Sequence, residues 1–327
     1  MNRVRNGSAV TPVGASGMPD ELNSGSCEGE PSNGAKRLTS RAYWNSLPIP
    51  EASRAPARSG KRWIPARWRQ VYREIRSVHA QRILHRVLLP PLLAEMRGGR
   101  FLEIGSAPGY NGLDFQRNYG LEPYGLEYSE PRAMAQRKLY RQHQLPEEWV
   151  IQGDFFDDRL LSPLRESFDV VASFGFIEHF EHPAQVIARH LEYLRPGGVL
   201  LVGVPNLGVG SVNGWLARRF NPAVYALHNI ETCTAAGFRR LYPPPGCDPV
   251  FCGPLGGVHL EVLPDERQQS RLTAWSLAKA WPIINAMNHI FIGNRLVSFP
   301  RSSSSWLMIA HKRAARPSRP PSKESPS

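Results

Sequence analysis

Short apolar runs alternate with longer stretches of mixed polarity between residues 100 and 205. Five segments predict strands, and the fourth of them, almost wholly apolar, is of the type that is buried on both faces of a parallel sheet. The first four are Phe101–Ile104, Pro123–Tyr128, Trp149–Phe155 and Phe168–Phe174, and the fifth strand follows the Pro-Gly-Gly turn within Leu194–Val202. The intervening stretches have the length of helices, so the alternation predicts a parallel, doubly wound α/β sheet.

Helix signals fill the segments between these strands. Helices are predicted over Tyr110–Asn118, Pro131–His143 and Pro183–Leu194. Pro131 and Pro183 stand in the first turn of two of them, where a proline costs no hydrogen bond. Ser129 precedes Pro131 and is a candidate helix cap.

The rhythm of strands and helices stops after the fifth strand. Residues 205–246 contain one predicted helix, Val212–Phe220, and a triple proline, and they are too many for a simple turn. Because this segment leaves the carboxyl edge of the sheet, it is predicted to be a lid insertion that forms a wall of the substrate pocket. Beyond it, a sixth strand is predicted at Val258–Val262, a helix at Leu272–Met287 and a last strand at Trp306–Ala310.

The two ends of the chain lack apolar periodicity. Residues 1–62, which are rich in Gly, Ser, Pro, Asn and Ala, are predicted to form a disordered tail, and so are residues 313–327. Residues 63–99 show apolar positions at helical spacing together with several arginines. This basic helical segment is interpreted as packing on the sheet edge or capping the ligand site. The alternative is contact with an anionic membrane or lipid.

The charge of the chain is concentrated outside its predicted domain. The net charge is +12 at pH 7, yet residues 100–310 hold 19 basic and 20 acidic residues. A nucleic-acid substrate normally needs a basic footprint near the site, so this distribution argues against one.

Cysteine content and hydropathy indicate the compartment. The four cysteines show no paired metal spacing, which favours reduced thiols in a cytoplasm. No apolar run approaches the ~20 residues that span a bilayer. The first residues carry no apolar stretch of the kind found in secretory signals. A cytoplasmic location is therefore predicted.

The first predicted strand ends in an acid and a glycine-containing turn. Glu103 is followed by Gly105-Ser106-Ala107-Pro108-Gly109, and its charge suits a cationic ligand but would repel a pyrophosphate. S-adenosylmethionine, whose sulfonium and ammonium groups are both positive, fits this turn. The spacing also departs from Gly-x-Gly-x-x-Gly, which argues against a nicotinamide dehydrogenase.

Two further acids close the next two strands. Glu127 is placed to accept hydrogen bonds from both ribose hydroxyls, as acids at this position do in dinucleotide folds. Asp154 is placed to accept from an adenine amino group, while Phe155 offers its ring to the base. The candidate cofactor-binding residues are therefore Glu103, Gly105, Ser106, Gly109, Glu127, Tyr128, Asp154, Phe155 and Phe174.

In this order, the five segments resemble class I S-adenosylmethionine-dependent methyltransferases. Ile177–Pro183 resembles the small-molecule branch that includes ubiquinone-biosynthesis O-methyltransferases. The resemblance implies a Rossmann-like, seven-stranded sheet over residues 100–312, mostly parallel with an antiparallel last strand. It also implies methyl transfer to a small molecule, at a hydroxyl of a metabolite, sugar or glycan precursor. Ala107 departs from the family's usual glycine, and Ala-Pro-Gly also occurs in ribose-methylating RNA enzymes of this fold.

Two histidines are candidate catalytic bases, since an imidazole has a pKa near neutrality. The resemblance places His179 opposite the methyl group, and His228 lies in the predicted lid. Each has a structural alternative, which is loop support for His179 and capping or backbone pairing for His228. Ubiquinone-pathway enzymes similar to this chain hold a divalent ion with acids and a histidine of this segment. Gly175 replaces one such acid here, so no metal is predicted.

Two other functions stay open. An RNA methyltransferase is suggested by Ala107 and the basic flanks, but the Asn-Pro-Pro-Tyr motif and the lysine-rich tetrad of such enzymes are missing. A non-catalytic scaffold with this fold would bind a partner or a membrane through its flanks. Retention of the three acids Glu103, Glu127 and Asp154 argues against that scaffold.

Overall fold

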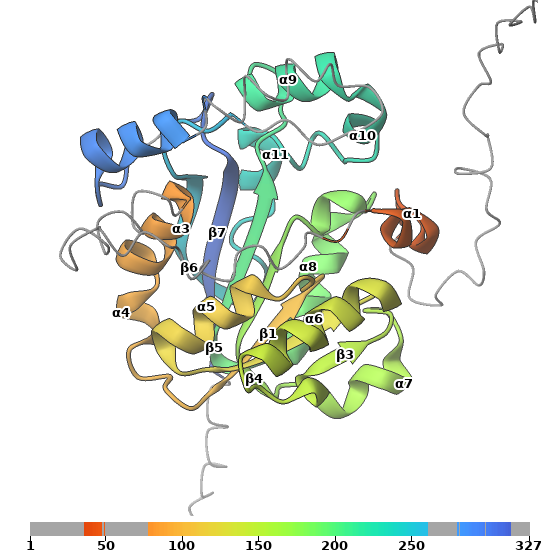
Figure 1. Ribbon diagram of the computed structural model, residues 1–327. Coiled ribbons are helices and arrows are strands. Elements are labelled where there is room, and N and C mark those ends of the chain that lie inside the picture. The colour runs from red at the N-terminus through yellow and green to blue at the C-terminus, as the bar shows by residue number, and fades with distance from the viewer. Residues whose placement is uncertain are drawn as a thin grey trace, which may run out of the picture.

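The computed structural model describes residues 36–47, 49, 78–260, 280, 282–297 and 299–314. These residues form a seven-stranded sheet with helices on both faces (Figure 1). Its strands are β1 Arg100–Ile104, β2 Glu122–Glu127, β3 Val150–Gln152, β4 Phe168–Phe174, β5 Leu194–Pro205, β6 Cys247–Leu255 and β7 Ser305–Lys312. Within the described ranges, no helix is long and apolar enough to cross a membrane.

The strand order is β3-β2-β1-β4-β5-β7-β6, and the first five of these strands pair in parallel. β7 runs antiparallel to both β5 and β6. The predicted doubly wound sheet with an antiparallel last strand is therefore confirmed. The order reverses between β1 and β4, and in such sheets a ligand crevice opens at this point, at the carboxyl ends of the strands.

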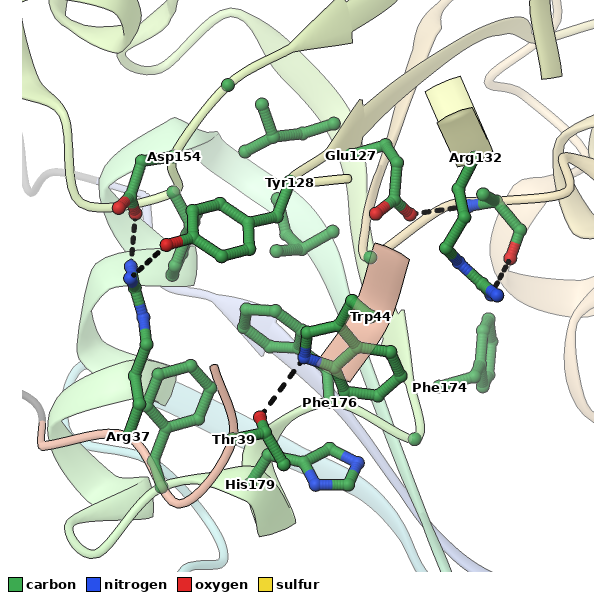
Figure 2. A pocket seen from close by; sticks show the side chains of 18 residues that line it. Arg37, Thr39, Trp44, Glu127, Tyr128, Arg132, Asp154, Phe174, Phe176 and His179 are labelled. Atoms are coloured by element: carbon green, nitrogen blue, oxygen red, sulfur yellow. Dashed lines mark hydrogen bonds and ion pairs between the residues drawn. The ribbon is translucent and has the colours of Figure 1, made fainter. Parts of the chain in front are cut away.

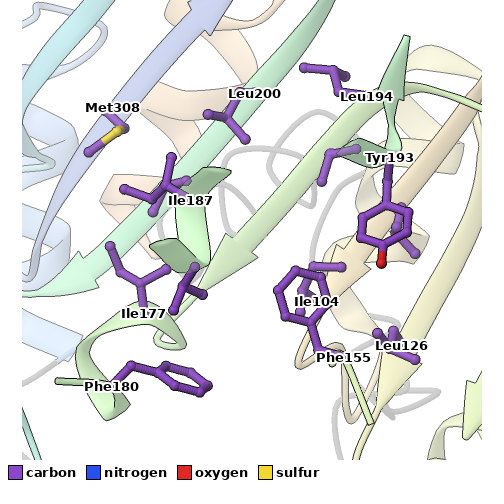
Figure 3. Packing of buried hydrophobic residues seen from close by; sticks show 14 of the residues in the cluster. Ile104, Leu126, Phe155, Ile177, Phe180, Ile187, Tyr193, Leu194, Leu200 and Met308 are labelled. Atoms are coloured by element: carbon purple, nitrogen blue, oxygen red, sulfur yellow. The ribbon is translucent and has the colours of Figure 1, made fainter. Parts of the chain in front are cut away.

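Alternate residues of the central strands enter two separate cores. Phe101 packs with α3 (His79–Ile83), α4 (Pro90–Leu93) and α5 (Tyr110–Tyr119) on one face. Leu102 and Ile104 pack with Ile187 of α8 (Pro183–Tyr193) on the other face. Figure 3 shows part of this second core, to which Leu126, Phe155 and Ile177 also belong. Burial on both faces explains why these strands read as continuous apolar runs.

The helices between the strands lie where the sequence predicts them. They are α5 Tyr110–Tyr119, α6 Glu130–Gln142 and α8 Pro183–Tyr193. Ser129 occupies the N-cap position of α6, but its side chain makes no capping hydrogen bond. The predicted helix at Leu272–Met287 is described only in part, and residues 282–287 are helical and continue into η6 (Asn288–Ile292).

The sixth strand differs from the prediction. Residues 258–260 form no strand, and the rest of Val258–Val262 lies outside the described residues. β6 instead comprises Cys247–Leu255, which contains Pro249 and Pro254. Proline lacks the N–H that an inner strand needs, and β6 tolerates two prolines because it is the edge strand of the sheet.

Residues 36–47, assigned above to a disordered tail, are structured, and that prediction is corrected for this N-terminal segment. It contains α1 (Arg41–Ser46), which begins after Ser40, whose side chain accepts from the Tyr43 N–H at 3.2 Å. The backbone of Lys36 and Leu38 pairs with the loop after β4, with bonds of 3.0 and 2.8 Å. These contacts supply the packing that the segment's own composition lacks.

The other predicted flanks are described only in part. Residues 63–77, the first part of the 63–99 segment for which membrane contact is the alternative, lie outside the described residues, as do 315–327. Residues 78–93 form α3, the π-helix η2 (Leu84–Leu88) and α4, and they bury Leu84 and Leu89 in the core. Arg313, assigned above to the C-terminal tail, instead pairs with Asp248 at 2.7 Å.

Candidate active site

A pocket opens where β1, β2 and β4 end, and the N-terminal segment closes one side of it (Figure 2). It encloses about 810 Å³ of space, including its open mouth. Its lining residues are Arg37, Thr39, Trp44, Ile104, Gly105, Ala107, Leu126, Glu127, Tyr128, Arg132, Gly153, Asp154, Phe155, Phe174, Gly175, Phe176, His179 and Phe180.

Glu127 joins the end of β2 to the turn after β1. Its carboxylate accepts from the Ser129 N–H at 2.9 Å and from the Ala107 N–H at 3.2 Å. The side chain lines the pocket although it is only 5% exposed. Gly105 has a φ of +70°, and a Cβ there would approach the Phe176 ring to 3.0 Å. Glu127 and Gly105, both predicted site residues, thus line the same pocket.

Three predicted cofactor ligands do not line this pocket. Glu103 is buried beneath the turn, where one oxygen accepts from Asn111 Nδ2 at 2.6 Å and the other has no hydrogen-bond partner in the part of the chain that the structure describes. Burial raises the pKa of the Glu103 carboxyl to about 8, so the predicted negative charge is suppressed near neutral pH. Ser106 donates to Gln136 at 2.7 Å, and Gly109, with a φ of +97°, begins α5. These three residues therefore support the turn on the side away from the pocket and do not line the pocket itself.

The acid after β3 already has a cationic partner. Asp154 accepts from the Phe156 N–H at 2.8 Å and forms an ion pair with Arg37 of the N-terminal segment. Arg37 also donates to the Tyr128 hydroxyl at 3.1 Å. Figure 2 shows this guanidinium at the pocket wall, between the two side chains predicted to receive the cofactor's adenosine.

Trp44 of the N-terminal segment also lines the pocket. Its indole N–H donates to Thr39 at 3.1 Å, and its ring stands edge-on to His179 with 5.0 Å between centroids. The guanidinium carbon of Arg132 lies 5.9 Å from the ring centroid of Trp44. Sequence reasoning missed Arg37, Thr39 and Trp44. One sequence signal could have found this segment. Ser40, a residue type that caps helices, directly precedes a short run that contains Tyr43 and Trp44.

The two candidate histidines meet in the structure. Their ring centroids are 4.7 Å apart, and Nδ1 of each lies near a backbone carbonyl, Leu227 O for His179 and Val224 O for His228. His179 lines the pocket but His228 does not. Burial lowers the pKa of both imidazoles, that of His179 to about 3, and raises the pKa of the neighbouring Glu178 carboxyl to about 8. Both rings are therefore uncharged at neutral pH.

The insertion between β5 and β6 contributes these contacts but no pocket surface. It holds α9 Val212–Phe220, α10 Pro222–Ala226 and α11 Ala235–Arg240. None of its residues lines the pocket, so the prediction that it walls the acceptor site is not supported by its position. The insertion contacts a pocket-lining residue through Leu227 O, which lies 3.1 Å from Nδ1 of His179.

The pocket residues fit S-adenosylmethionine. Glu127 lines the pocket with a carboxylate that can accept from ribose hydroxyls, and Leu126 and Phe155 line it with apolar side chains that suit a base. The unpartnered, buried oxygen of Glu103 lies just beneath the turn that would hold the methionine end.

Comparison with protein families agrees with this fit. A model of a methyltransferase domain matches residues 68–240, just over half of the chain. The chain therefore belongs to this methyltransferase domain family. Its cofactor is S-adenosylmethionine, as in its relatives.

A curated relative from Mycolicibacterium smegmatis is named "Probable S-adenosylmethionine-dependent methyltransferase". It is 33% identical over 123 residues, which cover 37% of this chain and 44% of the relative. The match thus spans less than half the length of that relative.

Two solved structures are similar in fold. The geranyl diphosphate C-methyltransferase of Streptomyces coelicolor aligns with 12% identity and a TM-score of 0.45, over 71% of this chain and 79% of its own. A Haemonchus contortus phosphoethanolamine N-methyltransferase aligns with 14% identity and a TM-score of 0.47, over 71% and 52%.

Proposed function

We propose that this chain transfers a methyl group from S-adenosylmethionine to a hydroxyl of a small molecule. The observation that carries the proposal is the pocket where β1, β2 and β4 end, which Thr39 and Trp44 of the N-terminal segment line together with His179. A pocket that the N-terminal segment walls on one side admits a small acceptor more readily than a folded RNA or protein. The near neutrality of residues 100–310 supports the same choice.

In this proposal the cofactor's adenosine lies along Glu127, Tyr128, Asp154 and Phe155. Its methionine part approaches Gly105, and Phe174 borders the reacting end. The cofactor supplies a methyl group activated by its sulfonium. The protein aligns the acceptor oxygen with that methyl and excludes water, and alignment alone contributes several kcal/mol to such reactions.

The hydroxyl must lose its proton as the new bond forms. We propose His179, which lines the pocket, and His228, which contacts it, as the residues that act on this proton. With a pKa of about 3, however, the imidazole of His179 alone is a weak base at neutral pH. A further group that acidifies the hydroxyl would therefore increase the rate.

The test is transfer of a labelled methyl group from S-adenosylmethionine to a panel of small hydroxylated compounds. We expect transfer to at least one phenol or sugar, loss of that transfer in Glu127→Ala, and retention in Glu122→Ala at the far end of the same strand. Transfer to total RNA with none to the panel would favour the RNA alternative. Cofactor binding without any transfer would favour the scaffold.

A further inference from the structure

Three metal-ligating side chains meet beside the pocket. One candidate ligand atom each from Glu178, His179 and His228 lies within 4.8 Å of the other two. Glu178 and His179 belong to η5 (Ile177–His179), whereas His228 comes from the insertion, so the cluster exists only in the folded chain. We propose that these residues form a binding site for one divalent transition-metal ion, with zinc as the first candidate.

Hydrogen bonds leave one nitrogen of each imidazole available to an ion. Nδ1 of His179 lies 3.1 Å from Leu227 O, and Nδ1 of His228 lies 2.8 Å from Val224 O. A carbonyl oxygen can only accept, so each Nδ1 carries the hydrogen and each Nε2 keeps its lone pair. Backbone carbonyls orient metal-binding histidines through the far nitrogen in the same way.

Glu178 supplies an oxygen that lacks any partner. The residue is 1% exposed, and its Oε2 is buried without a hydrogen bond among the described residues. A buried polar atom left unsatisfied in this way costs stability. An ion held between the carboxylate and the two imidazoles would remove that cost.

Backbone contacts on both sides of His228 hold it in place. The Asn229 N–H donates to Glu178 O at 2.6 Å, and the Asn229 side chain donates to Phe180 O at 3.1 Å. On the other side, Leu227 O pairs with His179. Ligands that share a zinc ion at ~2.0–2.2 Å lie roughly 3–4 Å apart, so a small side-chain adjustment would close the cluster.

The donor set indicates the kind of ion. Two imidazole nitrogens and one carboxylate oxygen suit Zn²⁺, Co²⁺ or Fe²⁺, whereas Mg²⁺ and Ca²⁺ prefer oxygen ligands. Three protein ligands also leave a coordination position open, as in catalytic zinc sites. The bearing of this ion on methyl transfer rests on the proposed function. With Nε2 of both histidines bound to the ion, neither imidazole could accept the proton, and the ion would act in their place by lowering the pKa of an acceptor hydroxyl bound to it.

The site can be tested on the full chain after removal of bound metals with a chelator. Titration with Co²⁺, followed by its visible absorption, and equilibrium dialysis with Zn²⁺ should each show one ion per chain. Glu178→Gln and His228→Ala should weaken this binding roughly tenfold or more. His182→Ala is the matched control, since His182 is an exposed histidine of the same loop, and it should bind the ion normally.

Circular dichroism of the metal-free variants shows whether they fold. A folded Glu178→Gln protein that binds Zn²⁺ as tightly as the wild type would overturn the proposal, and so would loss of binding in His182→Ala. If both cluster variants unfold, the wild type decides, because a real site raises its melting temperature as Zn²⁺ is added. No rise overturns the site. Cofactor binding without metal binding refutes only this inference, whereas metal binding without cofactor binding refutes only the proposed function.

Discussion

Replacement of Glu127 by alanine tests the cofactor site at its best-defined residue. The carboxylate is held by the N–H groups of Ala107 and Ser129, so its position is fixed before a ligand arrives. A hydrogen bond to a charged group contributes about 1.5–3 kcal/mol. Loss of the ribose contacts should therefore weaken S-adenosylmethionine binding roughly 10- to 150-fold.

Isothermal titration measures this loss directly. Because Glu127→Ala also frees two backbone donors, the melting temperature should fall, and Glu127→Gln separates the two effects by retaining one acceptor oxygen. Glu122→Ala, at the start of the same strand, should bind normally. An unchanged dissociation constant in a folded Glu127→Ala protein would refute the ribose assignment.

Three further predictions concern the surroundings of the pocket. His179→Ala and His228→Ala should leave cofactor affinity nearly intact and lower turnover, and full turnover in both would exclude them as catalytic residues. Arg37→Ala removes the ion pair with Asp154, so hydrogen exchange across the N-terminal segment should quicken, whereas loss of the exposed Lys36 ion pair should change it little. The folded chain holds a proton on Glu103 up to a pKa of about 8, which the unfolded chain releases near 4.5. Wild-type stability should therefore fall relative to that of Glu103→Gln as pH rises from about 5 to 8, as urea unfolding at several pH values would show.

The sheet was predictable because its central strands are buried on both faces. Phe168–Phe174 and the apolar part of Leu194–Val202 read as strands without knowledge of their neighbours, since either face would bury them. β6 was not predictable in this way. Pro249 and Pro254 argue against a strand until the position at the sheet edge is known.

The site residues likewise fall into two groups, those that the sequence could predict and those that it could not. Gly105, Glu127 and Asp154 follow strand ends, so the sequence placed them at one edge of the sheet, and they line the pocket. Arg37 acquires its role only through partners 91 and 117 residues away, which no local pattern reports. The meeting of His179 with His228 likewise depends on how the insertion folds back.

The central claim is that this pocket binds S-adenosylmethionine. Isothermal titration of the full chain with S-adenosylmethionine, and with NADH as the control, tests it most directly. The account predicts saturable binding of one S-adenosylmethionine per chain and no heat of binding with NADH. Absence of S-adenosylmethionine binding by the folded protein would contradict the account, and reversion of Ala107 to glycine would then be the first variant to examine.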